Sequence, residues 1–254
     1  MKRFFLIIAF VASVSSAQAW TKLLNDASLV LAKRYMTPAA VAEYNRIAAL
    51  KGSVDYKWVA SPDAAVALDA DLRSTSTDER DIVVRIERAT ELLRNRREHS
   101  DKEVYAALQE ILQLMPELHN ISRIHIEGIA NSQHDFTFTW IAGKPGSKRF
   151  EKRGTISWST FWTRLFCGWH QAWTPEYYAY DLGIHFAAER EQWMQGTPRD
   201  WAHDMGLRAK PMYEWAEQDY VMHNSQRLSL EEVHLGSVAR AGFRLAALLN
   251  NTLK

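Results

Sequence analysis

Two short spacings in the sequence place a histidine beside an aspartate. Asp181 and His185 are four residues apart, so on a helix both side chains would lie on one face, and His134 directly precedes Asp135. Imidazole and carboxylate groups are both zinc ligands, so either pair could contribute to a rearranged metal site. Because a spacing of four is common in helices by chance, neither pair predicts such a site by itself.

Tryptophan residues gather in one part of the chain. Rings at such a spacing can stack on nucleobases. More often, large aromatic side chains build a hydrophobic core, and we favour that interpretation, with a hairpin packed on helices. The tryptophans concerned are Trp158, Trp162, Trp169 and Trp173.

Charge and cysteine content limit the classes of function. The formal net charge is +1, which gives no general attraction to nucleic acid, so a phosphate-binding site must be local or depend on a metal. Cys167 is the only cysteine, so an internal disulfide is impossible. For an exported protein this means that stability comes from packing or from a metal ion rather than from cross-links.

The first 19 residues have the features of an export signal. A basic head and a short apolar run precede Ala17-Gln18-Ala19, which is typical of a cleavage site for signal peptidase. The apolar run is shorter than the ~20 residues that span a bilayer, and no later segment reaches that length. We therefore expect residues 1–19 to be a signal peptide and residues 20–254 to be the exported protein, periplasmic or extracellular, with Trp20 first. The alternative is an uncleaved anchor.

The rest of the chain is predicted to be mainly helical. Thr37-Pro38 combines a capping residue with a proline in the first turn, and Ser100 with Glu103 forms a capping box. The predicted helices run from Asn25 or Asp26 to Tyr35, from Thr37 to about Gly52, from Ser61-Pro62-Asp63 through Val66 and Leu68, from Thr77 with an acidic first turn, from Ser100 to Leu112, from about Trp169 to Trp193, from Pro198 to Trp215, and from Ser229 to Leu249.

Between about residues 135 and 162 the helical period is replaced by alternation. Phe136, Phe138 and Trp140 alternate with polar residues, and glycines and a proline follow at 143–146. This pattern predicts a β-hairpin with a long loop. We therefore expect a mainly α fold, a single helical domain with a small β-hairpin insert.

Four segments follow one another along the expected mature chain in an order that carries a resemblance. After Trp20 comes SLVLAKRYMTPAAVAEYNRI, followed later by GWHQAWTPEYY, by GTPRDWAHDM and by the final ARAGFRLAALLNNTLK. The third segment is similar to a Pro-x-x-Trp-Ala-x-Glu-Ser motif, and the last to an Ala-Gly-x-Arg-Leu-Ala motif that leads to Leu-Asn. In this order they resemble the S-one/P-one nuclease family, the zinc-dependent single-strand nucleases and 3'-nucleotidases.

The resemblance implies both a fold and a chemistry. The fold is the helical domain of the phospholipase C/single-strand nuclease type, and the chemistry is hydrolysis of phosphate esters by water that three zinc ions activate. It also implies that the free amine and the carbonyl of Trp20 bind zinc. A terminal amine has a pKa near 8, so a metal can deprotonate it, and cleavage would create this ligand.

Most of the zinc ligands that the resemblance implies are substituted. Arginine, for example, stays protonated and cannot bind zinc. The substituted positions are Asn25, Ala70, Arg85, Met115 and Thr174.

Four residues at the implied positions can still bind a metal. They are Trp20, His119, His125 and His170, and Asp71 lies beside Ala70, where a slip of one residue could recruit either Asp71 or Asp69. His119 replaces a carboxylate that could bridge two metals, whereas an imidazole offers one lone pair to one metal. We therefore expect fewer than three zinc ions, or none.

The resemblance leaves several functions open. One is a hydrolase of single-stranded nucleic acid or 3'-nucleotides whose activity is reduced or absent. Another is a secreted pseudoenzyme that binds nucleic acid, a nucleotide or a protein partner without cleavage, with Arg85 meeting a phosphate. A zinc phospholipase C-like protein and a purely structural helical protein are further alternatives. We expect a monomer, and glycosylation sequons begin at Asn120 and Asn250.

Overall fold

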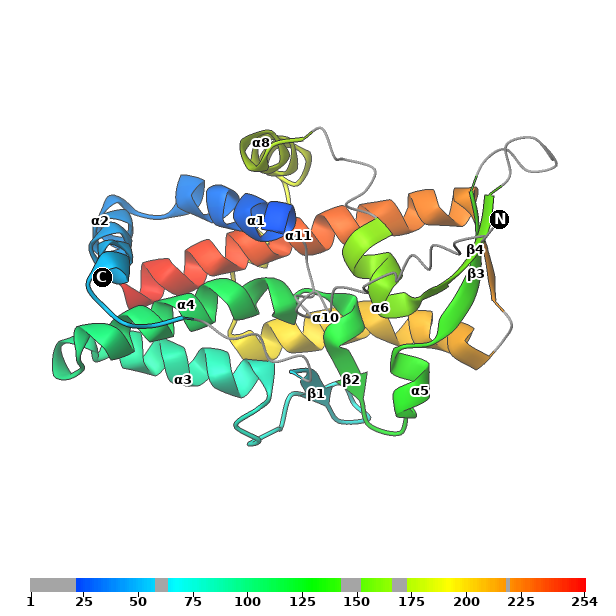
Figure 1. Ribbon diagram of the computed structural model, residues 1–254, viewed down its shortest axis with the longest axis horizontal. Coiled ribbons are helices and arrows are strands. Elements are labelled where there is room, and N and C mark those ends of the chain that lie inside the picture. The colour runs from blue at the N-terminus through cyan, green and yellow to red at the C-terminus, as the bar shows by residue number, and fades with distance from the viewer. Residues whose placement is uncertain (1–21, 58–63, 143–151, 166–172, 218–219) are drawn as a thin grey trace, which may run out of the picture.

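Helix α11 (Asn224–Thr252) is the element around which the other helices pack (Figure 1). Its 29 residues span about 44 Å, and its side chains are buried almost continuously from residue 236 to residue 249. The structure is a computed structural model that describes residues 22–57, 64–142, 152–165, 173–217 and 220–254. Within these ranges the chain is mainly helical, as the sequence predicts.

The helices form two groups about α11. Helices α1 and α8 pack on one side of it, while α3 packs against α4, which in turn contacts α11 (Figure 1). The α-helices besides α11 are α1 (Lys22–Tyr35), α2 (Pro38–Ala48), α3 (Ile82–Arg94), α4 (Asp101–Leu118), α5 (Asn131–His134), α6 (Trp158–Thr160), α8 (Pro175–His185), α9 (Arg190–Trp193) and α10 (Pro198–Tyr213). A single turn of π-helix, η4, covers Phe161–Leu165, and short 3-10 turns cover Ala49–Gly52 (η1), Arg96–Glu98 (η2), Ile121–Arg123 (η3) and Glu214–Glu217 (η5).

A glycine allows α1 to lie close against α11. A Cβ atom at Gly242 would lie 2.9 Å from Cβ of Leu31 and 2.8 Å from its Cδ2 atom, closer than real Cβ contacts. Gly242 belongs to the AGFRLA segment of the sequence. This part of the segment therefore has a packing role, because any side chain would push the two helices apart.

Two small sheets lie at the edge of the helical body. Strand β1 (Val66–Leu68) pairs in parallel with β2 (Ile124–Ile126), with Ala67 opposite His125. The other sheet has the order β4-β3-β5. In it β3 (Thr137–Ala142) pairs antiparallel with β4 (Lys152–Ser157) and parallel with β5 (Val221–His223). The pairing of β3 with β4 confirms the predicted β-hairpin, whose loop lies outside the described residues.

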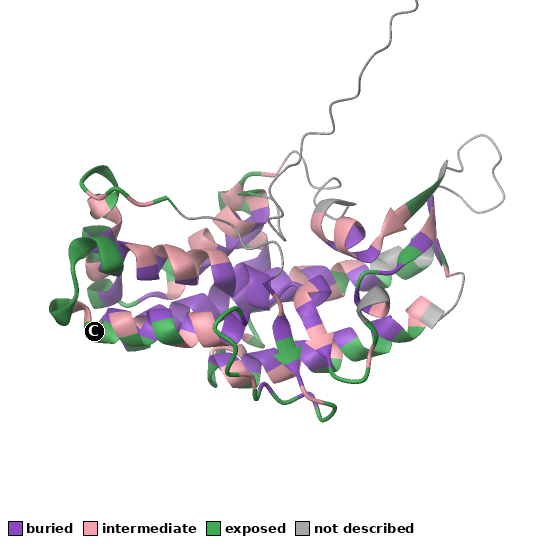
Figure 2. Ribbon diagram, turned by 60° about the horizontal axis from the view of Figure 1, so that its bottom comes forward, coloured by how far each residue is buried: buried purple, intermediate pink, exposed green. Residues whose placement is uncertain are grey.

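The aromatic residues near the hairpin are mainly core. Trp158 and Trp162 are fully buried, and the ring of Trp158 stacks on Phe136 with the centroids 5.4 Å apart. Trp173 is half-buried against Tyr178, and Trp169 lies outside the described residues. Figure 2 shows the buried residues concentrated along the inner faces of the helices. The core interpretation is therefore confirmed for Trp158 and Trp162.

Several predicted helix starts are correct because a local cap decides them. Thr37 accepts a hydrogen bond from the backbone N–H of Ala40 at the start of α2, and Ser100 forms the predicted capping box with Glu103. The prediction for α1 was wrong, because Asn25 lies inside the helix, with a buried Oδ1 atom that finds no hydrogen-bond partner among the described residues.

Two other predicted helices differ from the structure. The segment with Val66 and Leu68 forms β1 instead of a helix, because its partner β2 comes from far along the chain. Helix α3 begins after Asp81 rather than after Thr77. The Asp81 carboxylate accepts hydrogen bonds from the N–H groups of Val83 and Ala67, so it caps α3 and also ties it to β1.

No helix within the described ranges combines the length and the apolar character that crossing a bilayer requires. The core is instead an interior shared by α1, α3, α4, α10 and α11.

Candidate functional site

The buried residue His119 lies at the C-terminal end of α4. Its Nδ1 atom is 2.7 Å from the carbonyl oxygen of Met115, and its Nε2 atom is 3.1 Å from Nη1 of Arg244. An arginine can only donate hydrogen bonds, so Nε2 must be the acceptor and Nδ1 must carry the proton. The two contacts therefore define one tautomer of a neutral imidazole.

The surroundings of His119 keep it neutral. Burial lowers its pKa well below the ordinary value, and the charge of Arg244 lowers it further. The one lone pair of the ring points at Arg244. A metal ion could bind His119 only after the guanidinium had moved away, so the described contacts of His119 do not fit a zinc ligand.

Arg244 connects His119 to a carboxylate. Its Nη2 atom donates to Oδ2 of Asp204 over 2.7 Å, and its Nε atom donates to the carbonyl oxygen of Trp193 over 3.2 Å. With the bond to His119, all three nitrogens of this buried guanidinium have protein partners. Arg244 is therefore held in one orientation.

Two further arginines approach the same aspartate. Arg208 donates to Oδ1 of Asp204 over 3.2 Å, and Nε of Arg240 lies 3.2 Å from Oδ2. Burial raises the pKa of Asp204, but Arg244 and Arg208 outweigh that effect and hold it below its usual range. The result is a cluster of three arginines about one ionised carboxylate.

Regular helix geometry assembles this cluster. Asp204 and Arg208 are four residues apart on α10, and Arg240 and Arg244 are four apart on α11, so each pair lies on one helix face. The start of α10 is fixed by a capping box in which Thr197 and Asp200 exchange hydrogen bonds. The same helix start places Asp204 two turns below the cap, facing α11.

A separate open cleft of about 460 Å³ lies where β1 meets β2. The pairing of Ala67 with His125 brings the segment after β1 beside the predicted residue His125. Polar groups in the cleft walls are those of Asp69, Thr75, Ser76, His125, Glu127 and His134. Of the aspartates near Ala70, the cleft therefore contains Asp69 and not Asp71.

His125 stacks on His134 within this cleft. The ring centroids are 4.5 Å apart and the planes differ by 12°. Nε2 of His134 accepts a hydrogen bond from the N–H of Ile126 over 3.0 Å. Burial lowers the pKa of His134 to about 4 and also lowers that of His125, so both rings are neutral near pH 7.

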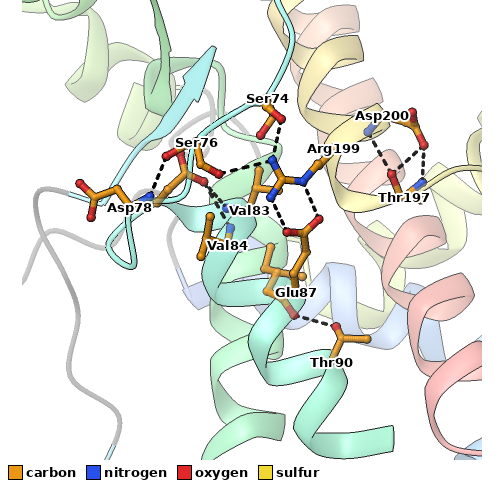
Figure 3. Close-up of polar contacts among 12 residues, drawn as sticks. Ser74, Ser76, Asp78, Val83, Val84, Glu87, Thr90, Thr197, Arg199 and Asp200 are labelled. Carbon is orange, nitrogen blue, oxygen red and sulfur yellow. Dashed lines mark hydrogen bonds and ion pairs between the residues drawn. The ribbon is translucent and has the colours of Figure 1, made fainter. Parts of the chain in front are cut away.

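One wall of the cleft is held by an arginine at the start of α10. Arg199 binds both carboxylate oxygens of Glu87, over 2.9 and 2.7 Å, and donates to the carbonyl oxygens of Ser74 and Ser76 (Figure 3). The four hydrogen bonds link the loop after β1 to α3 and α10. The loop that contributes Thr75 and Ser76 to the cleft is therefore fixed in place.

The other predicted positions have structural partners. Asp71 is exposed and pairs with Arg73, and Arg85 pairs with Glu110 over 2.6 Å between Nε and Oε1. Met115 is fully buried in the core, Ala70 lies in an exposed turn, and Thr174 caps α8 by accepting from the N–H of Tyr177. Trp20 and His170 lie outside the described residues.

The described donors do not gather into a metal centre. Within the ranges that the structure describes, no group of three or more histidine, cysteine, aspartate or glutamate side chains is arranged to hold a metal ion. His119 contacts Arg244 between α4 and α11, whereas His125 stacks on His134 in the cleft. The two predicted ligands thus have different sets of neighbours.

The first sequon is buried. Asn120 has no exposed surface, and its Oδ1 atom accepts hydrogen bonds from the N–H of Ser122, over 3.0 Å, and from its hydroxyl, over 2.9 Å. In the second, Asn250 accepts from the N–H of Thr37 and donates to the carbonyl oxygen of Tyr35. Both side chains stabilise the fold, and Asn120 is inaccessible once the chain has folded.

Sequence reasoning did not single out Asp204, Arg240 or Arg244 as site residues. Asp204 stands where the similar motif has its glutamate, and Arg244 is the arginine of AGFRLA. Two of the segments that carry the resemblance therefore meet directly in space. The sequence did contain a signal for this cluster, because Asp204 and Arg208, and likewise Arg240 and Arg244, are charged residues spaced four apart within predicted helices.

A comparison with models of known protein families finds no match, and a comparison with curated proteins finds none either. Membership of the nuclease family therefore remains a hypothesis based on the ordered segments.

Proposed function

We propose that this protein is a degenerate relative of the zinc-dependent single-strand nucleases that binds a 3'-nucleotide or the end of a single strand without hydrolysing it. One observation carries this proposal: Nη1 of Arg244 lies 3.1 Å from Nε2 of His119. Nε2 carries the only lone pair with which this ring could bind a metal. The resemblance implies a metal ligand at this position. An arginine there repels a cation and attracts a phosphate.

The chemistry of the cluster supports recognition of an anion over activation of water. Guanidinium groups donate paired hydrogen bonds to phosphate oxygens, and three of them lie about Asp204. A neutral His119 can hold Arg244 in position but has no free lone pair to act as a base. Because the nitrogens of Arg244 already have protein partners, the donor for a phosphate is Arg240, whereas hydrolysis would require His119 to lose its contact with Arg244.

The second candidate is the hydrolase itself, with fewer than three zinc ions. The direct ion pair between Asp204 and Arg244 favours the hydrolase, because it joins two of the segments that resemble the nuclease family in one place. In that case Trp20, His125 and His170 would have to supply the metal ligands. As for the context of the protein, we propose export by a cleaved signal and a monomeric state.

The test requires the mature protein, secreted with its own signal so that Trp20 becomes the first residue. Zinc per chain is measured by mass spectrometry, and hydrolysis of 3'-AMP and of a single-stranded oligonucleotide is followed with and without a chelator. Binding of the same oligonucleotide, labelled at its 5' end, is measured by fluorescence anisotropy.

The proposal expects clearly fewer than three zinc ions per chain, no chelator-sensitive turnover and saturable binding of the oligonucleotide or of 3'-AMP. Three zinc ions together with turnover that the chelator abolishes would contradict it and favour the hydrolase. Cleavage of phosphatidylcholine with no action on nucleotides would instead favour a zinc phospholipase C-like protein.

A further inference from the structure

Arg240 differs from Arg244 in having almost no protein partners. Its side chain is only 7% exposed, yet its buried Nε atom makes no hydrogen bond of acceptable geometry within the described chain, although it lies 3.2 Å from Asp204. Neither Nη atom makes a hydrogen bond within the described chain, and unlike Nε neither is fully buried. Solvent can therefore reach the Nη edge, and no protein acceptor occupies it, whereas the buried Nε atom lacks an acceptor at a cost in free energy.

The surroundings leave one edge of the Arg240 guanidinium available. The group lies over the ring of Trp193, with its central carbon 3.6 Å from the ring centroid. Its Nε atom faces Asp204, so the edge with the two Nη atoms is the one opposite this carboxylate. That edge is the one that forms paired hydrogen bonds with an oxyanion.

The local charge balance also favours an anion. Arg208, Arg240 and Arg244 face the carboxylate of Asp204, and the exposed Glu189 acts on Arg240 as a second, weaker compensating charge. Burial lowers the pKa of Arg240 to about 9, and Arg208 contributes to this, yet the group stays charged at neutral pH. An additional negative charge would relieve the repulsion among the arginines.

A glycine makes the position of Arg240 possible. A Cβ atom at Gly236, one turn earlier on α11, would lie 2.9 Å from Nη1 of Arg240. The guanidinium therefore rests directly over the backbone of α11. Any side chain at position 236 would displace it without removing a charge.

We propose that the Nη edge of Arg240, with the charge of Arg208 acting on it, binds one phosphate group. Arg208 contributes a positive charge close to Arg240 rather than a free donor, because its Nε atom is fully buried. Inorganic phosphate is the minimal ligand. That the natural ligand is a nucleotide rests on the proposed function, whereas binding of the phosphate group does not.

Two variants test the site, each compared with a matched control. Arg240→Met keeps a long side chain that can lie on Trp193 but removes the donors, and Gly236→Ala keeps every charge while displacing Nη1. Arg94→Met removes an exposed arginine of α3 that pairs with Glu91, so it controls for the loss of one positive charge. Circular dichroism and urea unfolding verify that each variant is folded.

Binding of inorganic phosphate is measured by isothermal titration at constant ionic strength, with chloride as the reference anion and 3'-AMP in a parallel series. We expect phosphate to bind saturably to the wild type and to Arg94→Met. Its affinity for Arg240→Met and Gly236→Ala should be lower than for the wild type by a factor of about ten or more. If Arg240→Met does not fold, the phosphate affinity of Gly236→Ala by itself tests whether Arg240 binds the phosphate.

Wild-type affinity for phosphate in a folded Gly236→Ala or Arg240→Met variant would overturn the inference, and so would a wild-type protein that does not bind phosphate. The outcome is separable from that of the proposed function. Hydrolysis of 3'-AMP would end the proposed function but leave the phosphate site intact. A protein that binds phosphate but does not bind 3'-AMP would support the phosphate site and contradict a nucleotide as the natural ligand.

Discussion

The carboxylate of Asp204 accepts a hydrogen bond from Nη2 of Arg244 over 2.7 Å, which joins α10 to α11. The two residues come from GTPRDWAHDM and ARAGFRLAALLN, segments that lie far apart in the chain. Arg244 then extends the contact to His119 at the end of α4. Three helices therefore meet at one buried polar network, and the state of each member depends on the others.

The first prediction concerns the protonation of His119. Because burial and Arg244 both lower its pKa, we expect His119 to remain a neutral Nδ1–H tautomer from pH 7.5 to pH 5. Nitrogen-15 NMR of the imidazole rings checks this, with assignment by a His119→Gln variant. The exposed His185 serves as an internal comparison for resonance position. Titration of His119 within that range would contradict the assigned hydrogen bonds.

The second prediction is a loss of stability in mild acid. His119, His125 and His134 all have a lowered pKa in the folded protein, whereas the unfolded chain takes up protons near pH 6.5. Their contribution is therefore complete above pH 6.5 and is lost as the pH falls below that value, in the case of His134 down to its pKa of about 4. His134, which is 3% exposed, accounts for about 3 kcal/mol of this loss.

Urea unfolding between pH 7.5 and pH 4.5 measures this effect. A His134→Gln variant should show a clearly shallower dependence on pH than the wild type. The control is His185→Gln, in which an exposed ring is removed, and it should follow the wild-type curve. Equal slopes for all three proteins would show that His134 does not take part.

The third prediction tests the approach of α1 to α11. Gly242→Ala should lower the free energy of unfolding by about 1–3 kcal/mol, because the new methyl group meets Cβ of Leu31. This loss would occur although alanine is the better helix former by about 1 kcal/mol. In the control Gly52→Ala, a Cβ atom meets nothing within 4 Å, and we expect a change of about 0.5 kcal/mol or less. Chemical denaturation of both variants provides the comparison.

The fourth prediction concerns the loop that lines the cleft. In Arg199→Lys, an ammonium group cannot hold both oxygens of Glu87 and the carbonyl of Ser74 at once (Figure 3). We expect faster hydrogen exchange across residues 74–78 and a loss of about 1–2 kcal/mol of stability. Arg94→Lys, at an exposed ion pair, should leave both measurements unchanged. Unaltered exchange in Arg199→Lys would mean that the loop is held by other contacts.

Local signals in the sequence predict much of the fold. Capping residues decide where α2, α4 and α10 begin, since Thr37, Ser100 and Thr197 act on backbone groups only three residues away. The alternation at Phe136 and Phe138 likewise predicts the hairpin. Because both partners of such a contact lie within a few residues of each other in the sequence, it can be predicted without knowing how the rest of the chain folds.

Longer contacts could not be predicted in this way. The sequence around Val66 predicts the start of a helix, but the segment forms strand β1 because it pairs with β2. Asp81 displaces Thr77 as the cap of α3 because its carboxylate also binds Ala67 of β1. Likewise, neither Asp204 nor Arg244 indicates a site until the packing of α10 against α11 is known.

Strands β1 and β2 bracket α3 and α4 in the sequence, so their pairing closes a connection that contains both helices. Helices α3 and α4 are joined by a short turn and can pack on each other early, at little entropic cost. Parallel pairing of the two strands is less local, so we expect it to follow once that helical hairpin has brought their ends together. We therefore expect the cleft around His125 to form late in folding, on a scaffold of helices that have already packed.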